Sequence, residues 1–119
     1  MAHLGFLAIS NQTSAFVPLR VSDANAYQVN GALVPRTLAR DGRIAVVGAA
    51  PLVEALLSTN EARTIILYGT PGKSYAVEST TNLASPAWTL FGQGVLTNQS
   101  RQFDAGRTNR TLYYRAREQ

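Results

Sequence analysis

The chain has 119 residues, of which 45% are hydrophobic and 15% charged, and its eleven basic and seven acidic side chains give a net charge of +4. This composition excludes intrinsic disorder, and the absence of cysteine excludes disulfides, thiolate metal sites and cysteine nucleophiles. No apolar stretch is long enough for a membrane-spanning helix, so we expect no membrane partner, and the length fits a single domain over residues 1–119.

The first part of the chain shows short apolar runs separated by turn residues. Runs at residues 4–10 and 15–21 flank a polar cluster, and Pro18 predicts an edge strand or a bulge because proline donates no ladder hydrogen bond. Two dipeptides typical of hairpin turns follow. They are Asn30-Gly31, between residues 26–29 and 32–34, and Asp41-Gly42, between residues 38–40 and 43–47.

Residues 51–58 allow two interpretations. Pro51 at the start and Glu54 in the first turn would suit two turns of helix, in which Leu52, Leu56 and Leu57 have near-helical spacing. The same residues could form a strand that runs into the following polar loop. We favour the strand slightly, because the segments on both sides have β patterns.

The second half of the chain contains clearer strands. A β-branched strand at residues 63–68 leads through Pro71-Gly72, the central pair of a predicted type II turn, into a strand at residues 74–79. Alternation places Tyr75 and Val77 on one face and Glu78 on the other. Further strands are predicted at residues 88–91, 95–97, 101–103 and 111–117, with a turn at residues 92–94 between the first two.

These signals predict about eight to ten short strands, with turns every eight to twelve residues, as in β-sandwiches and barrels. No segment keeps a helical period, which excludes a doubly wound α/β fold. We therefore expect an all-β, antiparallel β-sandwich in a single domain, either fibronectin-III/Ig-like or jelly-roll-like. Residues 1–62 would supply additional strands of that domain.

Catalytic and metal-binding constellations are not expected. His3 is the only histidine and stands in a segment that we expect to be frayed, so no histidine is available to activate a serine, and the acidic residues fall in turns or on solvent faces. Residues 69–74 superficially match a phosphate-binding loop, but their spacing is too short and a strand follows where a helix is needed. We expect no enzyme activity, no cofactor and no metal.

Aromatic side chains are the remaining candidates, because sugar rings stack on exposed aromatic faces. We expect Trp88 in the core as a hydrophobic anchor, together with Tyr75 and Tyr114. Alternation places Tyr68, Tyr113 and Arg115 on one outward side. The candidate ligand-binding residues are Tyr68, Tyr113, Arg115, Phe91 and Tyr27.

Residues 63–117 resemble a module found in large secreted bacterial proteins, often beside glycoside hydrolase domains. Its motifs occur here in order: Gly69 and Gly72, Tyr75 to Ser79, Asn82-Leu83, Trp88 to Leu90, Phe103-Asp104 and Tyr113 to Arg115. The resemblance implies a fibronectin-III-like or immunoglobulin-like accessory module. Such modules act as spacers, attachment units or carbohydrate-binding appendages, and the resemblance implies an extracellular location within a larger protein.

The leading expectation is a non-catalytic carbohydrate-binding or accessory module of a secreted bacterial polysaccharide-active protein. The partners would be a polysaccharide and neighbouring domains of a longer chain. The first alternative is a structural spacer or a protein-interaction and attachment module without a small ligand. A nucleic-acid partner is not favoured, because the arginines are scattered, but a polyanion site remains as a further alternative. It would use the late arginines Arg101, Arg107, Arg110, Arg115 and Arg117.

Overall fold

The computed structural model describes residues 13–22, 24–35, 40–59, 61–107 and 110–119. Strands are the only regular secondary structure in these ranges, which confirms the all-β fold, and within them no helix could cross a membrane. The described residues form a larger unit, residues 13–15 and 46–119, and a smaller one, residues 16–45.

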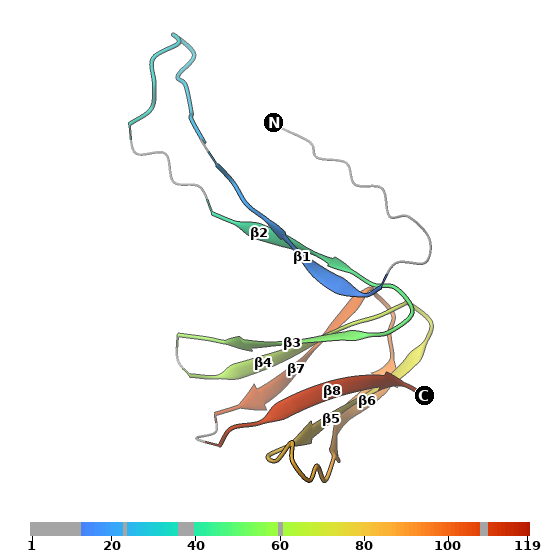
Figure 1. Ribbon diagram of the computed structural model, residues 1–119. Coiled ribbons are helices and arrows are strands. Elements are labelled where there is room, and N and C mark those ends of the chain that lie inside the picture. The colour runs from blue at the N-terminus through green and yellow to red at the C-terminus, as the bar shows by residue number, and fades with distance from the viewer. Residues whose placement is uncertain (1–12, 23, 36–39, 60, 108–109) are drawn as a thin grey trace. The chain divides into compact units, whose positions relative to one another are not determined.

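The larger unit contains six strands in two three-stranded antiparallel sheets (Figure 1). One sheet has the order β3-β4-β7, with bounds Leu52–Leu57, Arg63–Tyr68 and Ser100–Gly106. The other has the order β6-β5-β8, with bounds Thr89–Val95, Ser74–Thr80 and Tyr113–Glu118. The strand favoured for residues 51–58 is therefore confirmed as β3.

The hydrophobic core lies between the two sheets. Alternate residues of β4 and β5 point inward, and Ile65, Leu67, Tyr75 and Val77 are almost fully buried there together with Leu96. Burial of each such side chain contributes about 1.5–3 kcal/mol to folding. Further side chains from both sheets pack against this cluster, which makes the larger unit a β-sandwich. They are Val53, Phe91, Phe103, Ala105, Tyr114 and Ala116.

The turn between β4 and β5 has the predicted geometry. The Lys73 amide donates to the Thr70 carbonyl at 3.3 Å, and Gly72 has a φ of 86°, which the third position of a type II turn requires. The Gly72 amide also donates to the Leu96 carbonyl at 2.8 Å. This turn fixes the start of β5 and thus the alternation that carries Glu78 outward.

The predicted turn at residues 92–94 is wrong, because β6 continues through both of its glycines. Gly92 is needed for packing and not for a turn. A Cβ atom at this position would lie 2.7 Å from Cε1 of Phe103, whose ring fills the space beside the backbone. A glycine in a strand often marks such a close approach, and here it imitates a turn signal in the sequence.

The smaller unit contains all but one terminal residue of each of two strands, β1 (Ala15–Leu19) and β2 (Gly42–Val46), which pair in a two-stranded sheet. The Asn30-Gly31 hairpin is confirmed by a φ of 82° at Gly31 and an antiparallel bridge between Tyr27 and Leu33. Its arms form this single bridge and no full strands. The predicted strand at residues 4–10 and most of the one at 38–40 lie outside the described residues.

Candidate functional site

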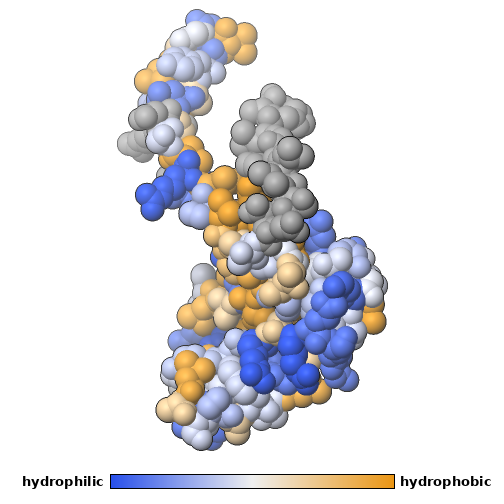
Figure 2. Space-filling model, turned by 45° about the vertical axis from the view of Figure 1, so that its right-hand side comes forward, coloured by the Kyte–Doolittle hydropathy of each residue, from blue (hydrophilic) through white to orange (hydrophobic). Residues whose placement is uncertain are grey.

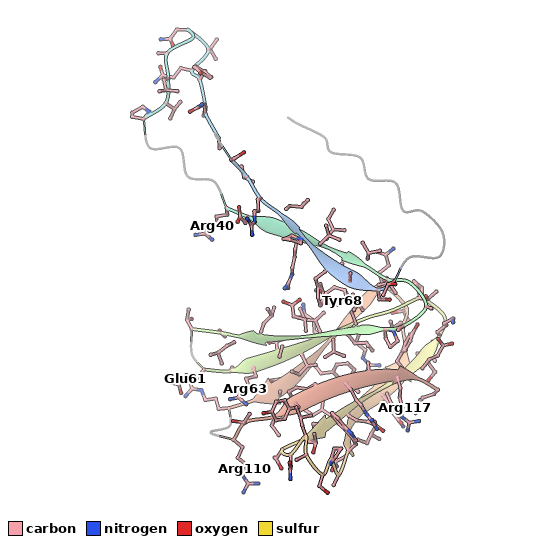
Figure 3. The ribbon with its side chains drawn as sticks, viewed as in Figure 1. Arg40, Glu61, Arg63, Tyr68, Arg110 and Arg117 are labelled. Atoms are coloured by element: carbon pink, nitrogen blue, oxygen red, sulfur yellow. The ribbon has the colours of Figure 1, made fainter. Side chains whose placement is uncertain are left out.

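The structure brings two of the five predicted site residues together. Tyr113 and Arg115 lie on the outer face of the β6-β5-β8 sheet. They alternate along β8 with Tyr114 and Ala116, which pack on the core. Tyr68 lies on β4 in the other sheet, where its hydroxyl donates to Oε2 of Glu54 at 3.0 Å (Figure 3). The expected common side of Tyr68 and Tyr113 is therefore wrong, since alternation identifies the face of a strand but not its sheet.

Phe91 faces the core, contrary to its expected exposure. Its ring packs edge-on against Tyr114 at 5.3 Å and against Phe103 at 6.2 Å between centroids. The cause is a register shift in the pairing of β5 with β6, where Val77 pairs with Gly92 but Glu78 pairs with Leu90. Phe91 is the extra residue of this bulge, and a bulge changes the direction of a side chain in a way that simple alternation cannot predict.

Tyr27 stands apart from the other candidates. It lies in the smaller unit beside the Asn30-Gly31 turn and is 65% exposed, as the sequence predicted. Tyr27 therefore belongs to the smaller unit, whereas Tyr113 and Arg115 belong to the larger one.

Trp88 lies directly before β6, is half-buried and is not a member of the described core, so its expected core position is wrong. Its ring lies under the guanidinium of Arg115, with 4.3 Å between Cζ and the ring centroid. This cation–π contact connects the segment before β6 to the outer face of β8 across β5. The polar stretch before Trp88 gave no strand pattern from which its direction could be predicted.

Glu78 is the centre of the outer face. Arg115 donates from Nε to its Oε2 at 2.8 Å and places a terminal nitrogen 2.8 Å from the same oxygen, while Arg117 donates from Nε to Oε1 at 3.0 Å. Glu78 is only 8% exposed, whereas about half of each arginine side chain is exposed. The sequence predicted that Glu78 faces outward but not that two arginines would cover it.

The electrostatics of this cluster favour the ionised carboxylate. The hydrogen bond from Arg115 lowers the pKa of Glu78 below its ordinary value of 4.5, and Arg117 adds to this effect. Burial acts in the opposite direction but is outweighed. Both oxygens of Glu78 accept hydrogen bonds, so the group serves to position the two arginines and is a poor general base.

The late arginines do not gather on this one face. Arg101 lies on β7 in the other sheet, with its guanidinium 5.1 Å from the ring centroid of Phe103. Arg110 lies before β8 and accepts a hydrogen bond through its carbonyl from Arg63 at 2.9 Å (Figure 3). Of the five late arginines, only Arg115 and Arg117 belong to the cluster around Glu78. The five residues are thus close together in the sequence but do not form one cluster in space.

The arrangement is suited to binding. The described ranges contain no group of three histidine, cysteine or acidic side chains that could hold a metal ion. Hydrophilic side chains cover much of the larger unit in the view of Figure 2, with hydrophobic groups between them. On the outer face of the β6-β5-β8 sheet, aromatic rings at Trp88 and Tyr113 thus stand beside guanidinium donors.

Comparisons with protein-family models, with curated proteins and with solved structures give no match to this chain.

Proposed function

We propose that this chain is a non-catalytic accessory module that binds polysaccharide through the outer face of its β6-β5-β8 sheet. The observation that carries the proposal is the contact chain Trp88–Arg115–Glu78–Arg117, with Tyr113 on the same strand face. It combines aromatic surface, on which the C–H face of a sugar stacks, with N–H donors for hydroxyl oxygens.

Preorganisation supports a binding role for this face. The Arg115 guanidinium is held from one side by the Trp88 ring and from the other by Glu78, so little side-chain entropy is lost when it contacts a ligand. Tyr113 is 39% exposed and stands two residues before Arg115 on the same face. An extended sugar chain could therefore meet a fixed donor and an accessible ring on one strand.

The strand order supports an immunoglobulin-like or fibronectin-III-like sandwich. Counted from β3, the first, second and fifth strands form one sheet, and the third, fourth and sixth form the other with the third strand in the middle. Immunoglobulin-like sandwiches place strands A, B and E in one sheet and C′, C and F in the other. The order agrees with the fold that the resemblance of residues 63–117 implies, and from this resemblance alone we propose a secreted bacterial polysaccharide-active parent protein.

Affinity electrophoresis of the 119-residue protein tests the proposal. Native gels containing cellulose derivatives, xylan, starch, alginate or polygalacturonate are run at low and high salt. The proposal expects retardation by at least one polysaccharide and a loss of it in Tyr113→Ala. Tyr68→Phe, on the other sheet, is the control and should leave the retardation unchanged. No retardation by any polysaccharide, or equal effects of the two variants, would contradict the proposed face.

A protein-interaction module is the second candidate, and the edge of β3 favours it. This strand lies at one end of its sheet, and its Leu56 and Leu57 are 42% and 69% exposed. Exposed apolar edge strands pair readily with other chains. Sedimentation velocity over a range of concentrations tests this candidate: association that Leu57→Lys abolishes would support it, and a monomer at all concentrations would contradict it.

A further inference from the structure

The outer face of the β6-β5-β8 sheet has more positive than negative charge at its centre. Two guanidinium groups, from Arg115 and Arg117, contact one carboxylate, from Glu78. The neighbouring Lys73 and Glu118 form their own ion pair at 2.8 Å and cancel each other. One positive charge of the arginine pair therefore has no counter-charge among these contacts.

The surplus charge is available to a ligand at Arg117. This side chain meets Glu78 through Nε alone, and its two terminal nitrogens make no hydrogen bond to the part of the chain that the structure describes. The side chain is 58% exposed. Its neighbour across the ladder on β5 is Ala76, which is fully buried and too small to cover the guanidinium.

The chemistry of the free group selects the class of ligand. The two terminal nitrogens of a guanidinium present parallel N–H donors, whose geometry matches the two oxygens of a carboxylate. Alternate residues along a strand are separated by about 6.6 Å. A chain of sugar units lying along β8 would therefore pass Arg117, Arg115 and Tyr113 in turn, with donors at the first two positions and a ring at the third.

We propose, on the basis of the polysaccharide-binding function above, that this face prefers acidic polysaccharides and binds the carboxylate of a uronic acid unit at Arg117. Glu78 holds Arg117 by its Nε and leaves the terminal nitrogens to the sugar carboxylate. The same cluster is too small for a duplex nucleic acid, whose binding needs many phosphate contacts along an extended basic surface.

The test uses one polymer in two charge states. Affinity electrophoresis and titration calorimetry are carried out with polygalacturonate and with the same polymer after complete methyl esterification, which removes the charge but keeps the sugar chain. The inference expects the ester to bind at least about tenfold more weakly, the loss typical of one charged hydrogen-bonded contact. Equal binding of the two polymers would overturn it while leaving the proposed function intact.

Two arginine variants localise the effect. Arg117→Gln should weaken binding of polygalacturonate about tenfold. Arg107→Gln changes the net charge equally at a residue that directly follows β7 of the other sheet, and it should stay within about twofold of the unaltered protein. Arg117→Lys, which keeps the charge but loses the paired donors, should fall between them. Circular dichroism and thermal unfolding verify that each variant is folded.

The remaining outcomes separate the inference from the function on which it rests. Equal losses in Arg117→Gln and Arg107→Gln would mean diffuse attraction and would overturn the inference. Binding of duplex DNA as tight as that of polygalacturonate would overturn it in favour of a general polyanion site. Binding of neutral polysaccharides alone would overturn the acidic preference only, and binding of none would overturn both proposals.

Discussion

Arg115 stacks its guanidinium over the indole of Trp88, with 4.3 Å between Cζ and the ring centroid, while the same group binds Glu78. The contact fastens the segment before β6 to β8, although β6 and β8 are not neighbours in the sheet. Arginine suits both contacts because its planar group can stack and present paired donors at once, which lysine cannot do.

We expect Arg115→Lys to lower the free energy of unfolding by about 1 kcal/mol, since a partly exposed cation–π contact contributes about 0.5–1 kcal/mol and the paired donors to Glu78 are also lost. Trp88 is the only tryptophan, so its fluorescence reports on this contact directly. Arg115→Ala should shift the emission to longer wavelength by uncovering the indole. Arg117→Ala is the matched control, and an equal shift in both variants would contradict the stacked arrangement.

The ionised Glu78 stabilises the folded state in a pH-dependent manner. Because the Arg115 hydrogen bond lowers its pKa in the folded protein below the ordinary 4.5, its stabilising contribution is complete above that value. It is lost as the pH falls through the lowered folded pKa. We expect Glu78→Gln to lower the unfolding midpoint in urea at pH 7, with the difference from the unaltered protein shrinking below about pH 4.5.

Urea unfolding of both proteins between pH 8 and pH 2.5 checks this prediction. The other acidic residues are common to the two proteins, so the difference between them isolates Glu78. A difference that stays constant across this range would show that the arginines do not stabilise the carboxylate. Glu61→Gln, at an exposed position outside the cluster, is the control and should show no such change.

The strands of the larger unit were accessible from sequence because local signals and packing agree there. Tyr75 and Val77 alternate with outward residues, and Pro71-Gly72 forms the predicted turn. The error at Phe91 comes from a bulge, and the error at Gly92 comes from a close approach to Phe103; both depend on residues in other strands. No local pattern carries that information.

The candidate face was only half predictable for a related reason. Alternation correctly turned Tyr113 and Arg115 outward, but the sheet to which a strand belongs depends on pairing between distant segments. For that reason alternation groups Tyr68 with Tyr113, although the two lie on different sheets. Because large aromatic rings are usually buried, the sequence predicts a core position for Trp88. In the structure, the guanidinium of Arg115 covers the ring instead, at the surface of the sheet.

Two tyrosines of the core, the buried Tyr75 and the half-buried Tyr114, provide a matched comparison. The hydroxyl of Tyr75 accepts a hydrogen bond from the Thr70 amide at 3.0 Å, whereas the hydroxyl of Tyr114 is buried without a hydrogen-bond partner in the described part of the chain. Burial raises the pKa of Tyr114, with the charge of Arg63 acting in the opposite direction. A buried polar group without a partner loses its hydration without compensation.

We therefore expect Tyr114→Phe to leave the free energy of unfolding unchanged or to raise it by up to about 1 kcal/mol, and Tyr75→Phe to lower it by about 1 kcal/mol. Chemical denaturation of the two variants under identical conditions measures both values. A loss in Tyr114→Phe as large as that in Tyr75→Phe would mean that the Tyr114 hydroxyl is hydrogen-bonded in solution.

Gly92 in β6 gives a direct test of the packing in the sandwich. Its replacement by alanine changes the free energy of unfolding in two opposite ways, through backbone entropy and through contact with Phe103. In an open strand, alanine would be more stable than glycine by about 0.5–1 kcal/mol, since glycine loses more backbone entropy on folding. Here the added Cβ would lie 2.7 Å from Cε1 of Phe103, whose ring is half-buried and covered by Arg101. We expect the clash to dominate, so that Gly92→Ala lowers the free energy of unfolding by about 1–3 kcal/mol.

Denaturant unfolding of Gly92→Ala, Phe103→Leu and the double variant forms a cycle that isolates this contact. Phe103→Leu alone should destabilise the protein by loss of buried ring surface. In the double variant, leucine leaves room for the alanine methyl group. Gly92→Ala should therefore lower the free energy of unfolding by about 1 kcal/mol less there than it does in the protein that keeps Phe103. Strictly additive effects would show that Gly92 does not face the Phe103 ring and would contradict the bulge between β5 and β6, which turns Gly92 toward that ring.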